Sequence, residues 1–481
     1  MSASKRYIKS LFLYILVFHS FYISPLKALI NDQWQRLETL CKSNYIDVIP
    51  WHGDISASIK KKIETSNSAI ILITPESMEA MLVNKPERAK SLSSFITSFI
   101  IDEFHAFVGQ PRGDQLISLI QRFTHLSKKR IRRIALSATI GDKEAIANAL
   151  NPKSPSTVEH INSSQSGQKI RLRVTGFEPP VINQVKTEEE EENERDARRR
   201  QFITYVASEL FKYQKNTNLV FPNSRDIVED LADAGNQLCN QKYVDRTFFA
   251  HHGFLSKEIR EDIEVSARKG EQTMTICCTS TLELGIDLGS VDTVFQITAP
   301  FNVSSLRQRL GRSGRRGNSP ILRTYICEAR LDNIQSSEED TYLREGLIRT
   351  IACLELIGEN WYEPPDNEGI SPSIAAHQIL SLLAQTGGAH VVQIWKFIEG
   401  TNAYRLSKDD FINILRHLKE QNTILQLSDG QISLSQKGEY ITHNKDFYTV
   451  FSTPEEWSIY ASGRIIARFP IRAESISIND S

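Results

Sequence analysis

Short apolar runs alternate with helix-like segments along the first two thirds of the chain. The runs fall into two sets, at 69–74, 95–103 and 133–139, and at 218–224, 247–252, 273–280 and 292–298. Strands that alternate with helices favour βαβ units and a parallel sheet. The pattern therefore predicts an α/β fold with two similar lobes in tandem.

A charged segment separates the two sets. Residues 186–200, KTEEEEENERDARRR, place an acidic block before a basic one. Such a run is typical of a solvated helix or a linker. We place the boundary between the lobes here.

The pattern changes after about residue 340. Apolar residues between 375 and 383 share one helical face, and Ser407 with Asp410 forms a capping-box-like helix start. Asp429 and Gly430 then follow between two alternating strands, where they would supply the positive φ angles of a tight hairpin. Helices followed by a hairpin predict a winged-helix domain, and the aromatic and β-branched residues from 447 to 469 predict the start of a β-rich domain.

Composition restricts the class of protein. The chain has 481 residues, 40% hydrophobic and 24% charged, which is typical of several globular domains. Its formal net charge of -1 excludes a general basic field, so any contact with nucleic acid must come from local patches. The six cysteines form no C-x-x-C pair, which favours a reduced cytoplasmic chain without structural zinc. The apolar run 11–23 imitates a secretory signal, but we interpret it as an old core strand joined to unrelated sequence.

The string IIDEFHAF carries the strongest local chemistry. An apolar strand that ends in Asp102 and Glu103 offers one carboxylate to hold Mg²⁺ through its water shell and a second to orient a hydrolytic water. His105 completes a D-E-x-H box. Taken alone, most Asp-Glu pairs at a strand end are surface carboxylates, and a lone histidine there is more often a packed core residue.

Further candidates follow other strands. Ser137 and Thr139 offer hydroxyls to the carboxylate box, and TSTLELGIDLG contributes Gly285 and Asp287. In RQRLGRSGRRG one helical turn would direct Arg312 and Arg315 to the same side, where guanidinium groups can stabilise a transferred phosphoryl group. An arginine-rich RNA or phosphate patch is the alternative for that segment.

The order of the pieces is more specific than any one of them. In sequence they are ISPLKAL (23–29), WHGD (51–54), TPESMEAML (74–82), DEFH (102–105), SAT (137–139), FPNSR (221–225), HHGFLSKEIR (251–260), TSTLELGID (279–287) and QRLGRSGRR (308–316). This series resembles the motifs of superfamily 2 helicases. Three further features look like those of the Lhr-type, large helicase-related branch. They are Arg112 and Gly113 after the D-E-x-H box, the LELGID sequence and the appended winged helix.

The resemblance implies two RecA-like lobes that use ATP and Mg²⁺ to move 3′ to 5′ along single-stranded DNA, with RNA or a hybrid as alternatives, often in DNA repair. Asp102 and Glu103 would hold Mg-ATP and the hydrolytic water, Gly285 and Asp287 would contact nucleotide, and Gln308, Arg312 and Arg315 would face the γ-phosphate. The resemblance also implies a set of residues that grip the strand: Pro25, Lys27, Thr74, Pro75, Arg112, Asn223, Ser224, Arg225 and Thr279. Ser137 and Thr139 would couple the two sites.

The sequence departs from this family at one point, because no Gly-Lys-Ser or Gly-Lys-Thr occurs among the 481 residues. That loop cradles the ATP phosphates. We therefore expect an incomplete first lobe and a truncated start, and two alternatives stay open: an inactive nucleic-acid-binding remnant, or half of a split enzyme whose partner chain supplies the loop. A winged-helix transcription factor is a third, which the acidic residues among the basic ones of 407–421 disfavour. The expected domains are 1–21 (atypical segment), 22–183 (first lobe), 184–201 (linker), 202–340 (second lobe), 341–445 (winged helix) and 446–481 (truncated β-rich domain).

Overall fold

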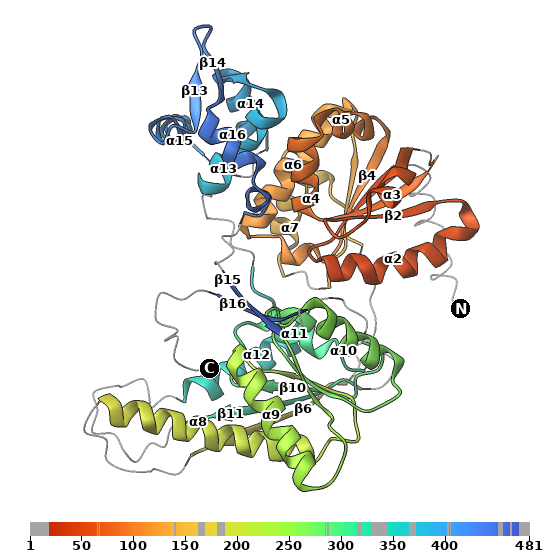
Figure 1. The fold of residues 1–481 in the computed structure, drawn as a ribbon, viewed down its shortest axis with the longest axis vertical. Coiled ribbons are helices and arrows are strands. Elements are labelled where there is room, and N and C mark those ends of the chain that lie inside the picture. The colour runs from red at the N-terminus through yellow and green to blue at the C-terminus, as the bar shows by residue number, and fades with distance from the viewer. Residues whose placement is uncertain are drawn as a thin grey trace. The chain divides into compact units, whose positions relative to one another are not determined.

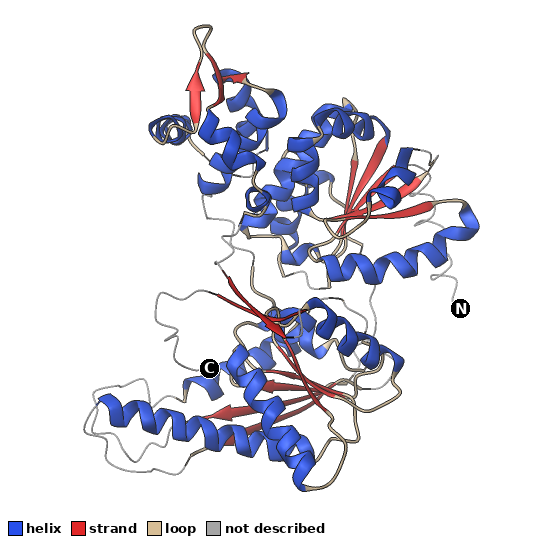
Figure 2. Ribbon diagram, in the orientation of Figure 1, coloured by secondary structure: helices blue, strands red, loops and turns tan. Residues whose placement is uncertain are grey.

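The described chain forms two compact units, in a computed structural model. The structure describes residues 19–64, 66, 68–138, 141–161, 169–179, 188–283, 285, 288–314, 319–328, 344–364, 372–401, 404, 406–450, 456–461 and 464–470, without the side chains of 64, 188–195, 456–461 and 464–470. The first unit combines described residues of Met1–Asn162 and Pro364–Thr453, and the second those of Ser163–Glu363 and Pro454–Ser481. Figure 1 labels their elements and Figure 2 shows their helices and strands. No helix in the described ranges has the length and apolar character needed to cross a membrane.

A parallel five-stranded sheet, in the order β2-β3-β1-β4-β5, forms the centre of the first unit. Its strands are β1 (His19–Ile23), β2 (Asp47–Trp51), β3 (Ala69–Ile73), β4 (Ile96–Ile101) and β5 (Arg132–Ala135). The helices around it are α2 (Lys27–Cys41), α3 (Ala57–Lys61), α4 (Pro75–Asn84), α5 (Pro86–Phe95), α6 (Pro111–Ser127) and α7 (Lys143–Leu150).

The inner strands β1, β3 and β4 of this sheet are almost fully buried because helices cover both of its faces. Phe21 and Ile23 of β1 pack into one core with residues of α4, α5 and α6, whereas Tyr22 packs into a second core with residues of α2. All five residues of β3 are buried. Near-continuous apolar strands are the expected sequence pattern of a parallel sheet buried on both sides.

An accessory domain, residues 372–450, belongs to the same unit. It consists of α13 (Pro372–Thr386), β12 (Ala389–His390), α14 (Val391–Thr401), α15 (Lys408–Glu420), β13 (Ile424–Gln426), β14 (Gln431–Leu434) and α16 (Gln436–His443). The predicted capping box of Ser407 and Asp410 opens α15. The hairpin also forms where it was predicted, but only Gly430 has a positive φ angle, of 82°, while the Asp429 carboxylate accepts a hydrogen bond from the Gln431 N–H.

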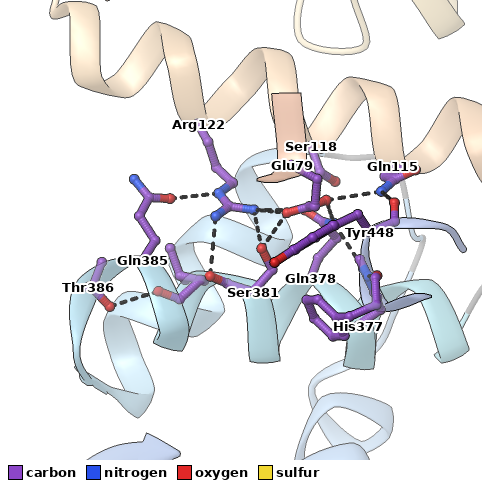
Figure 3. Close-up of polar contacts among 12 residues, drawn as sticks. Glu79, Gln115, Ser118, Arg122, His377, Gln378, Ser381, Gln385, Thr386 and Tyr448 are labelled. Carbon is purple, nitrogen blue, oxygen red and sulfur yellow. Dashed lines mark hydrogen bonds and ion pairs between the residues drawn. The ribbon is translucent and has the colours of Figure 1, made fainter. Parts of the chain in front are cut away.

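A buried polar network joins the accessory domain to the first sheet's helices (Figure 3). Arg122 of α6 lies 2.7 Å from Glu79 of α4, and these side chains are 2% and 0% exposed. Arg122 also donates to Gln385 and to the hydroxyl and carbonyl of Ser381, while Gln378 donates to Glu79. Burial by itself raises the pKa of Glu79, but Arg122, His377 and the hydrogen bonds from Ser381 and Gln378 outweigh it and hold that pKa below its usual range.

The second unit has a parallel six-stranded sheet in the order β6-β11-β10-β7-β9-β8. Its strands are β6 (Arg171–Phe177), β7 (Asn218–Phe221), β8 (Phe248–His251), β9 (Thr275–Cys278), β10 (Thr293–Ile297) and β11 (Ile321–Cys327). Its helices are α8 (Glu188–Phe211), α9 (Arg225–Gln241), α10 (Lys257–Lys269), α11 (Val303–Leu310) and α12 (Glu345–Gly358), and β15 (Glu456–Ala461) pairs with β16 (Arg464–Pro470) as an antiparallel hairpin.

Strand β6 corrects the boundary expected between the lobes. The expected first lobe ran to residue 183, yet β6 pairs in parallel with β11 along its whole length and so belongs to the second sheet. The charged segment that follows is helix α8, and Phe202, Val206 and Leu210 from its C-terminal half lie in the core of the second unit. The sequence pattern missed β6 because half or fully exposed residues interrupt its apolar positions.

Candidate nucleotide and nucleic-acid site

All five strands of the first sheet end along one line. The strand registers pair Trp51 with Ile73, Ile73 with Ile23, Ile23 with Ile101, and Ile101 with Ala135. Because the strands are parallel, the residues that follow them emerge at the same edge. This edge gathers Pro25 and Lys27 after β1, Trp51 to Asp54 at the end of β2, Thr74 and Pro75 after β3, Asp102 and Glu103 after β4, and Ser137 after β5.

Asp102 is held at this edge directly after β4, which lies next to the central strand β1. Its backbone N–H donates to the Ile23 carbonyl over 2.8 Å, and its Oδ1 accepts from the Glu103 N–H over 3.1 Å. Burial raises the pKa of the Asp102 carboxyl, a hydrogen bond from the Tyr22 side chain opposes that rise, and the Glu103 carboxylate adds to it. The carboxylate therefore lies where a cation would stabilise its charged form.

Glu103, His105 and Ser137 form a linked group beside it. Glu103 has a left-handed backbone, with φ 48°, at the start of a 3₁₀ turn, Phe104–Ala106. His105 Nε2 lies 3.4 Å from Glu103 Oε2, and its Nδ1 lies 3.1 Å from Ser137 Oγ. The histidine thus connects the carboxylate after β4 to the hydroxyl after β5, while Thr139 lies outside the described residues.

The predicted strand-gripping residues of this unit have differing surroundings. Lys27 is exposed and lies 3.5 Å from Asp54, and Pro25 and Pro75 are buried. The Thr74 hydroxyl accepts from the Ser77 N–H and so caps α4. Arg112 forms an ion pair with Glu76 over 2.7 Å, which ties the start of α6 to the first turn of α4.

The predicted grip of the second unit lies beyond β7 and β9. The Asn223 side chain donates to the Ala299 carbonyl over 2.6 Å, and the Ser224 hydroxyl caps α9. The Arg225 guanidinium lies 4.9 Å from the Phe254 ring centre. The Thr279 N–H donates to His251 at the end of β8, over 3.2 Å. These residues therefore cluster at the carboxyl edge of the second sheet.

The arginine-rich segment begins as helix α11 and leaves it at Leu310. Gln308 is half-buried on the helix, whereas Arg312 lies beyond it, is buried, and donates through Nε to the Glu283 carbonyl over 3.1 Å. Arg312 thus follows the end of the helix, and the expected one-turn relation to Arg315 falls on a residue outside the described ranges. Gly285 is half-buried, and Arg315 and Asp287 lie outside the described residues.

Sequence reasoning did not select two residues that organise the second unit. Arg309 is buried; it donates to the Glu283 carboxylate through Nε and Nη2 over 3.0 and 2.9 Å, and to Gln296 over 2.6 Å. Its guanidinium also lies 5.1 Å from the Phe221 ring centre. Glu283 thus holds Arg309 through its side chain and Arg312 through its carbonyl. Glu283 lies inside LELGID and Arg309 inside QRLGR, so their presence in matched motifs was the available clue.

The residues described at the first sheet's edge fit one part of a Mg-ATP site. Two adjacent carboxylates at a strand end suit Mg²⁺, which is usually held by one or two carboxylates together with water and phosphate oxygens. Among the described residues no three His, Cys, Asp or Glu side chains gather as a metal site on their own. The phosphates, however, need a loop of backbone N–H groups with a lysine, and no Gly-Lys-Ser or Gly-Lys-Thr occurs in the 481 residues.

Two family models match the chain. The DEAD/DEAH box helicase model matches residues 17–146, and the helicase conserved C-terminal domain model matches residues 201–317. The ATP-dependent helicase Lhr-Core of Saccharolobus solfataricus is 28% identical over 458 residues, which cover 91% of this chain and 49% of that protein. The chain belongs to the Lhr-type superfamily 2 helicases.

Other relatives show how much of an Lhr-type protein this chain represents. Lhr-Core of Methanocaldococcus jannaschii is 32% identical over 308 residues, covering 61% of this chain and 34% of that protein. Lhr helicase/uracil glycosylase of Escherichia coli is 29% identical over 358 residues, which cover 66% of this chain and 23% of that protein. The chain thus spans about half or less of the length of these relatives.

Solved structures establish the fold of two tandem RecA-like lobes. The helicase Lhr of Mycobacterium smegmatis, bound to ssDNA and AMP-PNP, matches with a TM-score of 0.70 and 21% identity. The match covers 95% of the present chain and 58% of the chain in that structure. The DEAD-box protein Mss116p, bound to ssRNA and AMP-PNP, matches with a TM-score of 0.50 and 14% identity over 86% of the chain and 81% of the structure. At these sequence identities the matches support the fold alone.

Proposed function

We propose that this chain carries the nucleic-acid-dependent ATPase and translocase machinery of an Lhr-type helicase. It would use ATP and Mg²⁺ to move 3′ to 5′ along single-stranded DNA, with RNA or a hybrid as alternative strands. The observation that carries the proposal is the common line at which the five strands of the first sheet end. It brings to one edge the predicted carboxylates, Ser137 and four of the predicted strand grips of that unit, Pro25, Lys27, Thr74 and Pro75.

The chemistry follows from the order of groups along that edge. Asp102 and Glu103 would hold the Mg²⁺ water shell and orient the attacking water. His105 would link Glu103 to Ser137 through the contacts of its two ring nitrogens. Gln308, Arg312, Arg315, Gly285 and Asp287 would complete the nucleotide site from the second lobe. In this proposal the accessory domain is a winged helix that supports the strand, and the protein works in the cytoplasm in DNA repair.

The absence of a Gly-Lys-Ser or Gly-Lys-Thr sequence supports a second candidate. In that case the chain binds nucleic acid without hydrolysing ATP by itself, as a remnant or as half of an enzyme whose partner chain supplies the phosphate-binding loop. In that case the loop of the partner chain would have to lie at the same carboxyl edge, next to Asp102.

Single-strand-stimulated ATP hydrolysis by the purified chain separates the two candidates. Glu103→Gln is the matched control, because it removes the charge of the water-orienting carboxylate and keeps its size. A stimulated rate that exceeds the mutant's supports the motor. Equal rates, together with salt-sensitive binding of a labelled oligothymidylate, would support the binding chain that depends on a partner. Failure to bind the oligothymidylate would contradict both candidates.

A further inference from the structure

A cationic cluster surrounds a tryptophan at the end of β2. Trp51 is 7% exposed and is held in register with Ile73 of β3. The Arg88 guanidinium lies 4.7 Å from the Trp51 ring centre, and the Lys60 ammonium lies 5.7 Å from it. The indole therefore positions two cations from different helices, α5 and α3, on one aromatic platform.

The two helices are also joined directly. Arg88 donates a hydrogen bond to the Lys60 carbonyl over 3.2 Å. This bond orients the guanidinium against the end of α3 while its charge stays close to that of Lys60. Because a planar guanidinium on an aromatic face loses little freedom when it binds a phosphate, the arrangement is preorganised for an anion.

Like charges dominate the electrostatic surroundings of this cluster. Burial lowers the pKa of Lys60, and Lys85, Arg88 and Lys27 lower it further, while Asp54 acts in the opposite direction. Asp54 is itself shared, since it lies 3.5 Å from Lys27 and 3.7 Å from His52. These cations repel one another, and a chain of phosphates would relieve that repulsion.

The cluster continues the sheet edge described above. Trp51 ends β2, which is the outer strand next to β3, and Lys27, a predicted strand grip, opens α2 after β1. A Cβ atom added to Gly53 would lie 3.8 Å from the Lys27 Nζ, so the loop after β2 runs beside that ammonium. The surface around Trp51 therefore adjoins the predicted grip.

We infer that Lys60 and Arg88, which lie on Trp51, and Lys85, whose charge acts on Lys60, form a phosphate-binding track that lengthens the single-strand path on the first lobe. The ligand is the backbone of a single-stranded nucleic acid. This inference rests on the proposed function, because it assigns new residues to the same strand. It explains how a chain with a net charge of -1 presents a local basic patch.

The salt dependence of oligothymidylate binding tests the track. The variant Lys60→Gln/Lys85→Gln/Arg88→Gln removes three charges, and each phosphate contact on a single strand contributes about 0.7 to the slope of log K against log salt. We expect the slope to fall by about 2 and the binding at low salt to weaken. The variant Lys60→Arg/Arg88→Lys keeps the charges and should keep the wild-type slope.

A matched control lies at the opposite edge of the sheet. Lys128, Lys129 and Arg130 are exposed and lie between the end of α6 and the start of β5, at the amino ends of the strands. Their triple glutamine variant should bind with nearly the wild-type slope. Equal loss of slope in both triple variants would show diffuse attraction and overturn the track, as would an unchanged slope in the cluster variant.

Footprinting of the wild-type chain gives a test that needs no variant to fold. Amine acylation with and without oligothymidylate should show protection of Lys60 and Lys85 and none of Lys128 and Lys129. Protection of Lys27 without Lys60 and Lys85 would overturn the track and leave the proposed function standing. Absence of any protected lysine, with no binding in solution, would count against the proposed function itself.

Discussion

Among the described residues, an arginine–glutamate pair is buried in each of the two units, and the two pairs have different roles. In the first unit Arg122 and Glu79 are 2% and 0% exposed and join two helices of the first lobe to the accessory domain. In the second unit Arg309 and Glu283 are 6% and 12% exposed and join the end of β9 to helix α11. The first pair fixes an interface between domains, whereas the second fixes the geometry inside a candidate site.

The two pairs also differ in how their remaining polar atoms are satisfied. Arg122 donates to side chains and a carbonyl of α13, which lies more than 250 residues away along the chain. Arg309 finds its partners within its own lobe, and Glu283 uses its backbone carbonyl to hold Arg312 as well. A buried ion pair is costly to desolvate and becomes useful when its partners complete the hydrogen bonding. The second pair is slightly more exposed, and it is held by two hydrogen bonds from Arg309 to one Glu283 carboxylate oxygen within the candidate site.

The largest effect should follow from removing one member of the more buried pair. Arg122→Met leaves the Glu79 carboxylate unpaired in the interior, so the free energy of unfolding of the first unit should fall by about 3–5 kcal/mol. Urea denaturation measures it. The double variant Glu79→Leu/Arg122→Met should recover much of the loss, because it leaves no lone charge.

A surface pair provides the matched control for that measurement. Arg199 and Asp230 lie 2.6 Å apart but are 41% and 46% exposed. Arg199→Met should therefore cost less than about 1 kcal/mol. If Arg122→Met were no more destabilising than Arg199→Met, the network would not hold the accessory domain in place.

The second pair should show a smaller cost and a dependence on geometry. Arg309→Met should lower the free energy of unfolding of the second unit by about 2–3 kcal/mol, since Glu283 is partly reached by water. The free energy of unfolding of Arg309→Lys should lie between that of this variant and that of the wild type. Lysine keeps the charge but loses the two hydrogen bonds to Glu283 and the contact with the Phe221 ring. A lysine variant as unstable as the methionine variant would mean that charge contributes nothing there.

A close backbone approach distinguishes two glycines of the first unit. A Cβ atom at Gly113 would lie 1.9 Å from the Phe107 carbonyl oxygen, whereas one at Gly53 would meet only the Lys27 ammonium at 3.8 Å. Gly113→Ala should therefore cost about 1–3 kcal/mol, as in other overpacked sites, and Gly53→Ala should be close to neutral. Thermal unfolding of both variants checks this; equal melting temperatures would show that the start of α6 shifts freely.

The elements could be predicted where local chemistry decides them. The buried strands β3 and β4 were visible as apolar runs, and Ser407 marked the start of α15 through its capping box with Asp410. The two tandem lobes followed from the alternation of strands and helices along the chain, whereas the order of the strands within each sheet was not predicted. Strand β6 was missed because exposed or half-exposed residues occupy all of its positions, so it lacks the apolar run of the inner strands.

The candidate site was predictable in its residues but not in its contacts. The sequence placed Asp102 and Glu103 at a strand end, and the resemblance proposed the coupling role of Ser137. No pattern could show that Tyr22 hydrogen-bonds Asp102 from a neighbouring strand, or that Arg309 and not Arg312 would pair with the Glu283 carboxylate. These facts depend on register and rotamer, which are set by tertiary packing.

The smallest effect concerns two carboxyls of the first unit whose pKa values shift in opposite directions. Burial raises the pKa of Asp102, so its charged form destabilises the folded state at neutral pH. Asp102→Asn should therefore raise the free energy of unfolding at pH 7 by about 0.5–1 kcal/mol, as substitutions that relieve strained functional sites often do. This gain should vanish as the pH falls through the raised pKa towards the ordinary aspartate value.

Glu79→Gln provides the opposite case in the same unit. Arg122 and its neighbours outweigh burial and hold the pKa of Glu79 below its usual range, so its charge stabilises the fold at neutral pH and this contribution disappears as the pH falls below the ordinary glutamate value and through the lowered pKa. Relative to wild type, the two variants should thus differ in opposite senses at pH 7 and converge in acid. Melting temperatures across this pH range measure both curves. Curves parallel to that of the wild type would show that folding shifts the pKa of neither carboxyl. A destabilised Asp102→Asn would show that its hydrogen bond from Tyr22 outweighs the cost of burial.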